Sequence, residues 1–378
     1  MSESGDRTPT ADAQAARKKV LIADIQLFLA AVSFGSGFVG QKEAFLEHVG
    51  PLTFNAVRFA ISTVLIFVLL PLLGPKRGQH RDDDKHESKD QLPLLASISG
   101  EEMHPEDDYH PGGALASTRA MGQRYAGAMR LLWYGTLLGV FNFLGSSLQQ
   151  AGIKWLTSAE SSFLTGLYVV FTPLVQVIAP WLVTPEHRPG LNTWIAVVLS
   201  LIGLFITSGS SLSSLKLGPG ELLTLSASFF WTFFILLLDI ATDRCNAMHI
   251  TVVQLFVTTC LSIVASYFLE HGEWNLHHLW ASWPIMLFLG TVECVAFAFG
   301  AQGQIYAPPH HAAIIYSSET VWAIGFGYLF LQESLSLRDA IGCGFLIVAT
   351  LCAKLDCTEP LKRLYRQVQN LLTPRRPS

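Results

Sequence analysis

Residues 161–183 form an uncharged, apolar run that constrains the fold more than any other part of the sequence. At about 1.5 Å of rise per residue, a helix of these 23 residues spans the roughly 30 Å hydrocarbon core of a bilayer. Polar and small residues interrupt the run, and lipid offers them no water, so they must face protein or a watery cavity. We expect a helix that lines a transport path, with close packing against neighbouring helices as the alternative. The interrupting residues are Thr165, Gly166, Tyr168, Thr172, Pro173 and Gln176.

The rest of the chain is similarly apolar. Charged residues make up only 14% of the 378 residues, hydrophobic residues make up 50%, and the mean hydropathy is +0.38. Soluble domains carry about 25% charged residues, so the composition indicates a polytopic membrane protein. Ten segments of suitable length predict an all-α integral membrane fold with ten transmembrane helices. These segments are residues 20–41, 51–73, 131–151, 158–183, 191–209, 219–240, 247–269, 282–303, 309–331 and 336–355.

Polar segments flank and interrupt these spans. We interpret residues 1–19 and the basic residues 356–378 as cytoplasmic tails, and the charge-dense residues 74–130 as a disordered cytoplasmic loop. Within the loop, Asp90, Leu94 and Leu95 match the acidic di-leucine sorting pattern DxxxLL. A sorting adaptor that binds the loop is therefore a candidate partner, with a chance match as the alternative.

The distribution of lysine and arginine along the chain predicts its orientation in the membrane. With both termini in the cytoplasm, the inner segments hold 20 of these residues and the outer loops hold 4, while Arg58 lies within a span. Cytoplasmic segments of membrane proteins typically carry such an excess of lysine and arginine, so both termini are predicted to be cytoplasmic. Whether the membrane is the plasma membrane or an internal one is left open.

The ten spans divide into two halves of five, residues 20–209 and 210–355. Because five is odd, the second half must enter the membrane inverted, which is the arrangement of many secondary transporters. In a weak alignment of the halves, Arg58 lies opposite Gln254, and Gly139 and Asn142 lie opposite Gly290 and Glu293. The sequence therefore predicts an inverted repeat.

Several motifs resemble the EamA-type members of the drug/metabolite transporter superfamily. They are FGSGFVGQKEAF (34–45), VRFAIS (57–62), QQAGIKWLTSAESSFLTGLYVVFTPL (149–174), GELLTLSASFFWTFFILLLD (220–239) and the segment 312–348. Phe34 stands where the family has Trp in its first-helix motif, and Glu319 is followed by Thr320 where the family usually has Pro. Losing that Pro removes a kink from the ninth span. The family's Glu after this helix matches Glu333, and Glu186 is an approximate counterpart in the first half.

This resemblance implies a transporter of small organic solutes such as amino acids, nucleotide sugars, other metabolites or drugs. It covers about 20–73 and 131–355 and leaves the substrate, the direction and the coupling ion open. A receptor or trafficking factor that retains the transporter fold is the alternative. We expect no enzymatic activity, cofactor or nucleic-acid partner; the expected partners are a small-molecule substrate and the lipid bilayer, and a homodimer is left open.

Few polar groups within the spans could bind a substrate or a coupling ion. Glu319 and Glu293 fall near the centres of two predicted spans, where a titratable carboxyl group suits proton coupling, or equally a neutral packing role. Arg58 either pairs with a carboxylate or meets an anionic substrate, and Asp24 and Asp239 fall near helix ends. The candidate substrate and coupling residues are Glu319, Glu293, Arg58, Tyr168, Thr165, Gln150, Trp231, Tyr316 and Gln302.

Other chemistries find little support in the sequence. His310 and His311 are adjacent, so on a helix they point about 100° apart and do not readily chelate one metal ion. The sequence contains no phosphate-binding G-x-x-x-x-G-K-[ST] motif and neither H-E-x-x-H nor G-x-S-x-G. We therefore expect secondary transport by alternating access, proton-coupled or by exchange, with the third, fourth, eighth and ninth spans and parts of the first and sixth lining the cavity.

Overall fold

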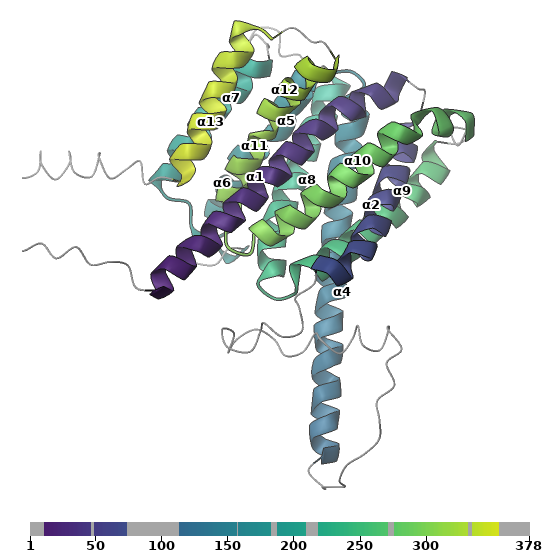
Figure 1. The fold of residues 1–378 in the computed structure, drawn as a ribbon, viewed down its shortest axis with the longest axis vertical. Helices are drawn as coiled ribbons and strands as arrows, with labels where there is room; N and C mark the ends of the chain where they lie inside the picture. The colour runs from purple at the N-terminus through teal and green to yellow at the C-terminus, as the bar shows by residue number, and fades with distance from the viewer. Residues whose placement is uncertain are drawn as a thin grey trace, which may run out of the picture.

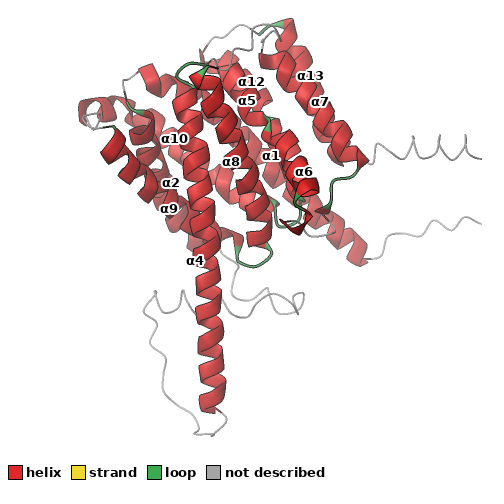
Figure 2. Cartoon of the chain, turned by 180° about the vertical axis from the view of Figure 1, so that it is seen from behind, coloured by secondary structure: helices red, strands yellow, loops and turns green. Residues whose placement is uncertain are grey.

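The structure is a computed structural model, and it describes residues 11–46, 49–73, 113–156, 158–182, 187–208, 218–270, 276–331 and 335–354. Every regular element in these ranges is a helix, and the helices gather into one bundle (Figures 1 and 2). They are α1 (Ala11–Leu46), α2 (Pro51–Leu73), α4 (Gly113–Gly152), α5 (Ser158–Gly166), α6 (Tyr168–Ile178), α7 (Leu191–Ser208), α8 (Pro219–Thr242), α9 (Ala247–Leu269), α10 (Leu276–Gly303), α11 (Pro309–Ser317), α12 (Glu319–Leu331) and α13 (Leu337–Lys354), with the 3-10 turn η1 (Pro180–Leu182).

Eight segments of the described residues are long and apolar enough to cross a membrane, judged by length and composition. They correspond to the first eight expected spans, and α2 and α9 have the expected bounds. The ninth expected span is divided between α11 and α12, each too short to cross alone. The tenth corresponds to α13, whose 18 residues include Arg338, Asp339 and Lys354. The all-α membrane architecture is confirmed, while the count of ten spans stays a prediction.

Two helices begin earlier than expected. α1 begins at Ala11 rather than at residue 20, and α4 begins at Gly113 rather than at 131. The expectation of disorder was therefore wrong for residues 113–130, and Figure 1 shows this part of α4 projecting far from the bundle. The segment contains five alanines and no proline, and extending an existing helix avoids the cost of nucleating a new one.

The fourth and ninth spans are each broken near their middle. α5 ends at Gly166 and α6 begins at Tyr168, and α11 ends at Ser317 and α12 begins at Glu319. At both breaks the backbone tightens into i→i+3 hydrogen bonds, such as Ser318 N–H to the Ile315 carbonyl at 3.0 Å. The expected loss of a kink was therefore wrong, because the ninth span breaks without the family's proline.

Serine side chains contribute to the break between α11 and α12. The Ser317 hydroxyl donates to the carbonyl of Ile314, and the Ser318 hydroxyl donates to that of Ile315, each at 2.7 Å. Such local bonds compete with regular helix hydrogen bonds and often bend helices. The break directly precedes Glu319, which therefore begins a helix instead of lying within a straight one.

Helix packing follows a reciprocal pattern. α1 packs along α10 as α4 packs along α8, and α2 contacts α10 as α4 contacts α9. α1 contacts α11 and α12 as α8 contacts α5 and α6, while α2 packs on α9 and α7 packs on α13. Each helix therefore has a counterpart with equivalent contacts. The counterparts are α1 and α8, α2 and α9, α4 and α10, α5 and α11, α6 and α12, and α7 and α13.

Glycines bring two of the reciprocal pairs close together. A Cβ atom on Gly139 of α4 would lie 2.8 Å from the Gln254 carbonyl oxygen of α9. A Cβ atom on Gly290 of α10 would likewise lie 2.8 Å from the Arg58 carbonyl oxygen of α2. Small residues allow helices to approach in this way within membranes, so a larger side chain at either position would force the pair apart.

Hydroxyl groups bind across the same two contacts. Thr258 donates to the Gly139 carbonyl at 3.1 Å, and Ser62 donates to the Gly290 carbonyl at 2.7 Å. The correspondence therefore extends from the helices to individual hydrogen bonds. It agrees with the alignment that sets Gly139 opposite Gly290.

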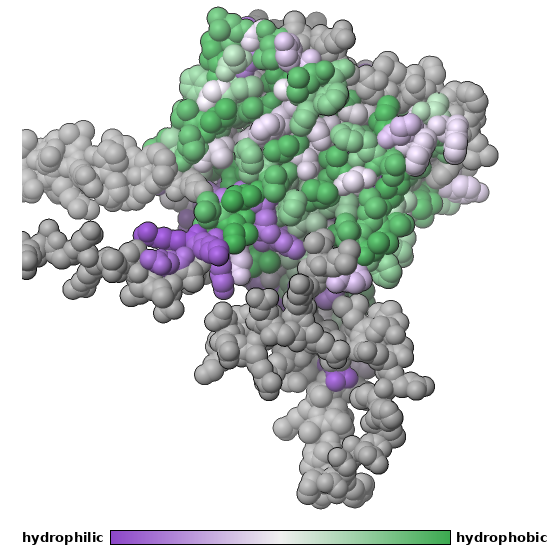
Figure 3. All heavy atoms as spheres, in the orientation of Figure 1, coloured by the Kyte–Doolittle hydropathy of each residue, from purple (hydrophilic) through white to green (hydrophobic). Residues whose placement is uncertain are grey.

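Apolar side chains cover much of the outer surface of the bundle (Figure 3). Phe67, Phe268 and Leu329 are between 63% and 67% exposed, although they belong to three different helices. In water such a surface would be costly, whereas in a bilayer it faces lipid. The strongest hydrophilic colour in Figure 3 lies toward the end from which α4 projects.

Candidate functional site

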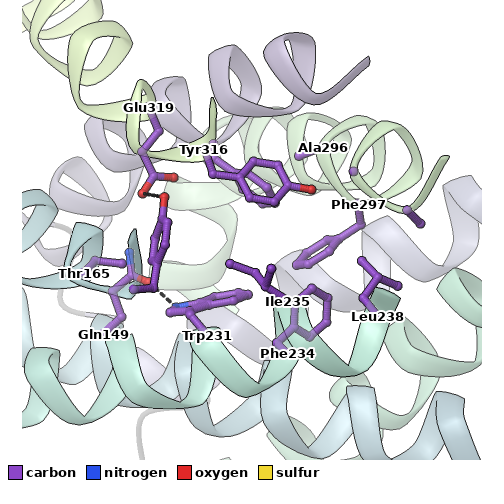
Figure 4. A pocket seen from close by; sticks show the side chains of 14 residues that line it. Gln149, Thr165, Trp231, Phe234, Ile235, Leu238, Ala296, Phe297, Tyr316 and Glu319 are labelled. Atoms are coloured by element: carbon purple, nitrogen blue, oxygen red, sulfur yellow. Dashed lines mark hydrogen bonds between the residues drawn. The ribbon is translucent and has the colours of Figure 1, made fainter. Parts of the chain in front are cut away.

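A cavity lies in the bundle next to the two helix breaks. α1, α4, α5, α6, α8, α10, α11 and α12 all contribute to its wall, which includes the helices expected to line the path. Aromatic and aliphatic side chains surround the space, with a few polar groups among them (Figure 4). The lining residues are Phe34, Gln149, Thr165, Tyr168, Trp231, Phe234, Ile235, Leu238, Ala296, Phe297, Gly300, Ala301, Tyr316 and Glu319.

Tyr168 and Glu319 join the two broken helices across the cavity. Each is the first residue of the helix that follows a break, and the Tyr168 hydroxyl donates to Glu319 Oε1 at 3.0 Å. Glu319 is 6% exposed and Tyr168 is 4% exposed, so little solvent reaches this pair. Glu319 lies in the N-terminal turn of α12, where the helix dipole favours a negative charge.

Aromatic rings form the other side of the cavity. The rings of Trp231 and Phe297 are stacked with centroids 6.4 Å apart, and Phe34 meets Phe297 edge-on at 5.4 Å. Phe34 also meets the ring of Tyr316 at 6.0 Å. The Trp231 indole N–H donates to Gln149 Oε1 at 3.0 Å, which fixes the orientation of the indole.

Five of the nine residues predicted for substrate or coupling line this cavity. The sequence marked them as polar or aromatic side chains within apolar spans, and the fold brings them together from five helices, α5, α6, α8, α11 and α12. They are Thr165, Tyr168, Trp231, Tyr316 and Glu319.

The other four predicted residues lie elsewhere. Gln150 is 1% exposed but does not line the cavity. Gln302 accepts a hydrogen bond from Gln26 at 2.8 Å. Arg58 and Glu293 form an ion pair with each other at 2.8 Å, and neither lines the cavity. The predicted pairing of Arg58 with a carboxylate is confirmed.

Residues that the sequence did not single out complete the wall. Gln149 contributes the amide that the neighbouring Gln150 was expected to supply, because adjacent helix positions point about 100° apart and only packing decides between them. Phe234 and Phe297 resemble ordinary core residues in the sequence. Phe34 was visible as the aromatic residue of the first-helix motif, but not as a cavity residue.

The remaining predicted positions cannot be placed. Asp90, Leu94 and Leu95 lie outside the described residues, and so do Glu186 and Glu333. Their roles stay predictions.

The ion pair of Arg58 and Glu293 is deeply buried. The two side chains are 2% and 9% exposed, and the guanidinium also lies over the rings of Phe54 and Phe59, at 5.4 and 4.9 Å from their centroids. A buried pair of this kind is sensitive to removal of either partner, because the remaining charge has no solvent.

The reciprocal contact, between α4 and α9, carries neutral side chains. Asn142 on α4 and Gln254 on α9 correspond to Glu293 and Arg58, and both are buried. Asn142 donates to the Thr258 hydroxyl at 3.2 Å. The same packing therefore holds a charged pair on one side and amides on the other.

Histidines bind polar side chains around one end of the bundle. His311 lies 3.0 Å from an Asp24 oxygen, and His187 lies 3.3 Å from an Asp239 oxygen. Both aspartates are buried, so they are interior hydrogen-bonding groups rather than interfacial ones. His310 instead lies 3.1 Å from the Gln176 amide oxygen, so the two adjacent histidines have different partners.

These contacts link the broken spans to α1 and α8. α11 is joined to α1 by His311 and to α6 by His310, and the segment after α6 is joined to α8 by His187. Among the residues that the structure describes, no group of three or more His, Cys, Asp or Glu side chains could hold a metal ion.

Comparison with known proteins agrees with this picture. A family model described as the EamA-like transporter family matches residues 218–354. An uncharacterized transporter of Archaeoglobus fulgidus is 24% identical over 337 residues, which cover 89% of this chain and 87% of the relative. Another from the same organism is 30% identical over 165 residues, covering 43% of this chain and 55% of that relative.

A solved structure described only as a crystal structure of a protein has the same fold. It has a TM-score of 0.57 at 14% identity and covers 90% of this chain and 96% of that one. At this identity the likeness concerns the fold alone. The family resemblance expected from the sequence is confirmed for residues 218–354, which match the EamA-like transporter family, and the apolar helices support a multi-pass membrane protein.

Proposed function

We propose that the protein is a secondary transporter that moves a small organic solute by alternating access through the cavity between two inverted five-helix repeats. The observation that carries this proposal is the position of the cavity, which adjoins the breaks of both discontinuous spans. Transporters typically bind their substrates near the membrane midplane at such broken helices, where the repeats meet.

The numbering of the elements supports the repeat. Ser158 and Pro309, which begin α5 and α11, are 151 residues apart, and so are Tyr168 and Glu319, which begin α6 and α12. Gly139 and Gly290 differ by the same 151 residues. Tyr168 and Glu319 thus occupy equivalent positions, and their hydrogen bond crosses the proposed axis between the repeats.

Alternating access requires contacts that form in one state and break in the other. The bonds of His311 to Asp24 and of His187 to Asp239 connect the broken spans to α1 and α8 at one end of the bundle. Opening of this end would separate those partners while the opposite end closes. In the predicted topology this end faces the cytoplasm, as both termini do.

Glu319 is the proposed coupling residue. It binds a proton or the solute in one state and releases it in the other, because a charged carboxylate at 6% exposure costs several kcal/mol unless it is paired or hydrated. The titratable side chains that face it are Tyr168 from α6 and Tyr316 from α11. The described lining residues of α1, α4, α5, α8 and α10 include no ionisable side chain.

The test is solute flux in liposomes. Thermal shifts of the purified chain against metabolite mixtures identify ligands, since binding to the native state raises its apparent stability. Uptake of these ligands is then measured with and without a pH gradient. Glu319→Gln keeps the shape of the protonated acid, so this variant should fold but lose uptake driven by the pH gradient.

Gln302→Asn is the matched control, because Gln302 was also a predicted site residue but lies outside the cavity. It should transport like the unaltered chain. Wild-type rate and pH dependence in Glu319→Gln would refute the coupling role. Specific ligand binding without flux in the unaltered chain would instead support a receptor that retains the transporter fold.

A further inference from the structure

We infer that the solute is an organic cation with an apolar or aromatic body, held between the aromatic rings of the cavity and the carboxylate of Glu319. This inference rests on the proposed function, because it assigns a substrate class to the same cavity. Three properties of the cavity wall carry it: its charge, its aromatic rings and its hydrogen-bond donors.

The charge of the wall has one sign. Glu319 is the one acidic residue among the described lining residues, and these include no lysine, arginine or histidine. Arg58, a buried cation of the bundle, is already paired with Glu293 and does not line the space. An anionic solute would therefore enter a dry space beside a carboxylate with no cation to compensate it.

The rings offer a surface that suits a cation. Trp231, Phe234 and Phe297 lie within 6.4 Å of one another, centroid to centroid. Tyr316 continues the wall toward Glu319 (Figure 4), and Phe34 meets the rings of both Phe297 and Tyr316. The faces of aromatic rings carry partial negative charge and attract ammonium groups within about 6 Å, most strongly where water is excluded. Quaternary and other alkylated ammonium groups are recognised in this way.

Two of the hydrogen-bond donors of the wall are already engaged. The Tyr168 hydroxyl donates to Glu319, and the Trp231 indole N–H donates to Gln149. Carboxylate or phosphate solutes need several donors aimed at their oxygens, whereas an alkylated ammonium group needs none.

The test compares three probes of similar size that differ in charge: benzyltrimethylammonium, the neutral N,N-dimethylbenzamide and the anion benzoate. Binding to the purified full chain in nanodiscs is measured by isothermal titration calorimetry at pH 8. We expect benzyltrimethylammonium to bind at least tenfold more tightly than the neutral probe, and benzoate not to bind measurably. This comparison uses the unaltered chain and does not depend on the folding of any variant.

Two variants locate the binding. Glu319→Gln should abolish the preference for the cation over the neutral probe. Trp231→Leu should weaken binding of the cation at least tenfold, whereas the control Trp280→Leu, at a residue that is 79% exposed and outside the cavity, should not change it.

Equal or tighter binding of benzoate or N,N-dimethylbenzamide would overturn the inference, as would the absence of any binding by benzyltrimethylammonium. If benzoate binds and Trp231→Leu weakens it, the cavity is still the solute site and only the substrate class is wrong. The proposed function is decided separately, by the flux of solutes found in the metabolite screen.

Discussion

Neutralising the buried ion pair should reproduce the arrangement of the reciprocal helix contact. Arg58 and Glu293 lie 2.8 Å apart between α2 and α10, and the reciprocal contact between α9 and α4 carries Gln254 and Asn142. The double variant Arg58→Gln/Glu293→Asn therefore places the same two amides on both sides of the bundle. We expect this variant to fold, because the chain already accommodates these side chains in equivalent packing.

The single variants should be less stable, and by unequal amounts. Glu293→Asn leaves the Arg58 guanidinium buried at 2% exposure, and a guanidinium cannot lose its proton, so we expect a loss of about 3–5 kcal/mol in the free energy of unfolding. Arg58→Gln leaves a carboxyl group that can take up a proton and become neutral, so the expected loss is smaller, about 1–3 kcal/mol.

The double-mutant cycle isolates the coupling energy between Arg58 and Glu293. The contacts of Arg58 with Phe54 and Phe59 are lost in both variants that lack the guanidinium, so they cancel from the coupling energy. Unfolding in mixed micelles of dodecylmaltoside and dodecyl sulfate should give a coupling of at least about 2 kcal/mol. Losses that simply add in the double variant would refute the reasoning, and so would a smaller loss for Glu293→Asn than for Arg58→Gln.

Three further predictions follow from packing, hydrogen bonding and charge. Gly139→Val should destabilise the protein by about 1–3 kcal/mol, because a Cβ atom there would lie 2.6 Å from that of Val257, whereas Gly344→Ala, with no atom within 4 Å, should be neutral or stabilising in thermal unfolding. His311→Leu removes the imidazole 3.0 Å from an Asp24 oxygen and should lower the midpoint of thermal unfolding; an unchanged midpoint would mean that this bond does not hold the end of the bundle closed. Cysteines placed in residues 80–110 should react with impermeant reagents only from the cytoplasm, and reaction from the other side would reverse the predicted topology.

The sequence predicted the spans well where hydropathy alone defines them. α2 and α9 have the expected bounds because their apolar runs end abruptly at polar or proline-containing segments. The breaks at Leu167 and Ser318 were not predicted, because neither residue is a strong helix breaker and the interruption depends on neighbouring backbone and hydroxyl groups. The helical start of α4 was missed, since polar composition obscured a segment that extends an existing helix.

The cavity was predictable only in part. Tyr168 and Glu319 stood out as polar groups in apolar runs, and the cavity brings them together. Glu293 stood out for the same reason, but it pairs with Arg58, 235 positions away in the sequence, and packing alone reveals that pairing. Phe297 gave no signal, because an aromatic side chain in a membrane helix usually packs or faces lipid.

Solvent access to the cavity tests the central claim most directly. In a cysteine-free background, Thr165→Cys places a thiol in the cavity wall, and Ala349→Cys, fully buried in a helix outside that wall, is the control. In sealed proteoliposomes of known orientation, an impermeant thiol reagent should modify the thiol at 165 from either side of the membrane, and a transported solute should slow both reactions. The control thiol should not react. Modification from one side only, or modification that a transported solute does not slow, would contradict alternating access through this cavity.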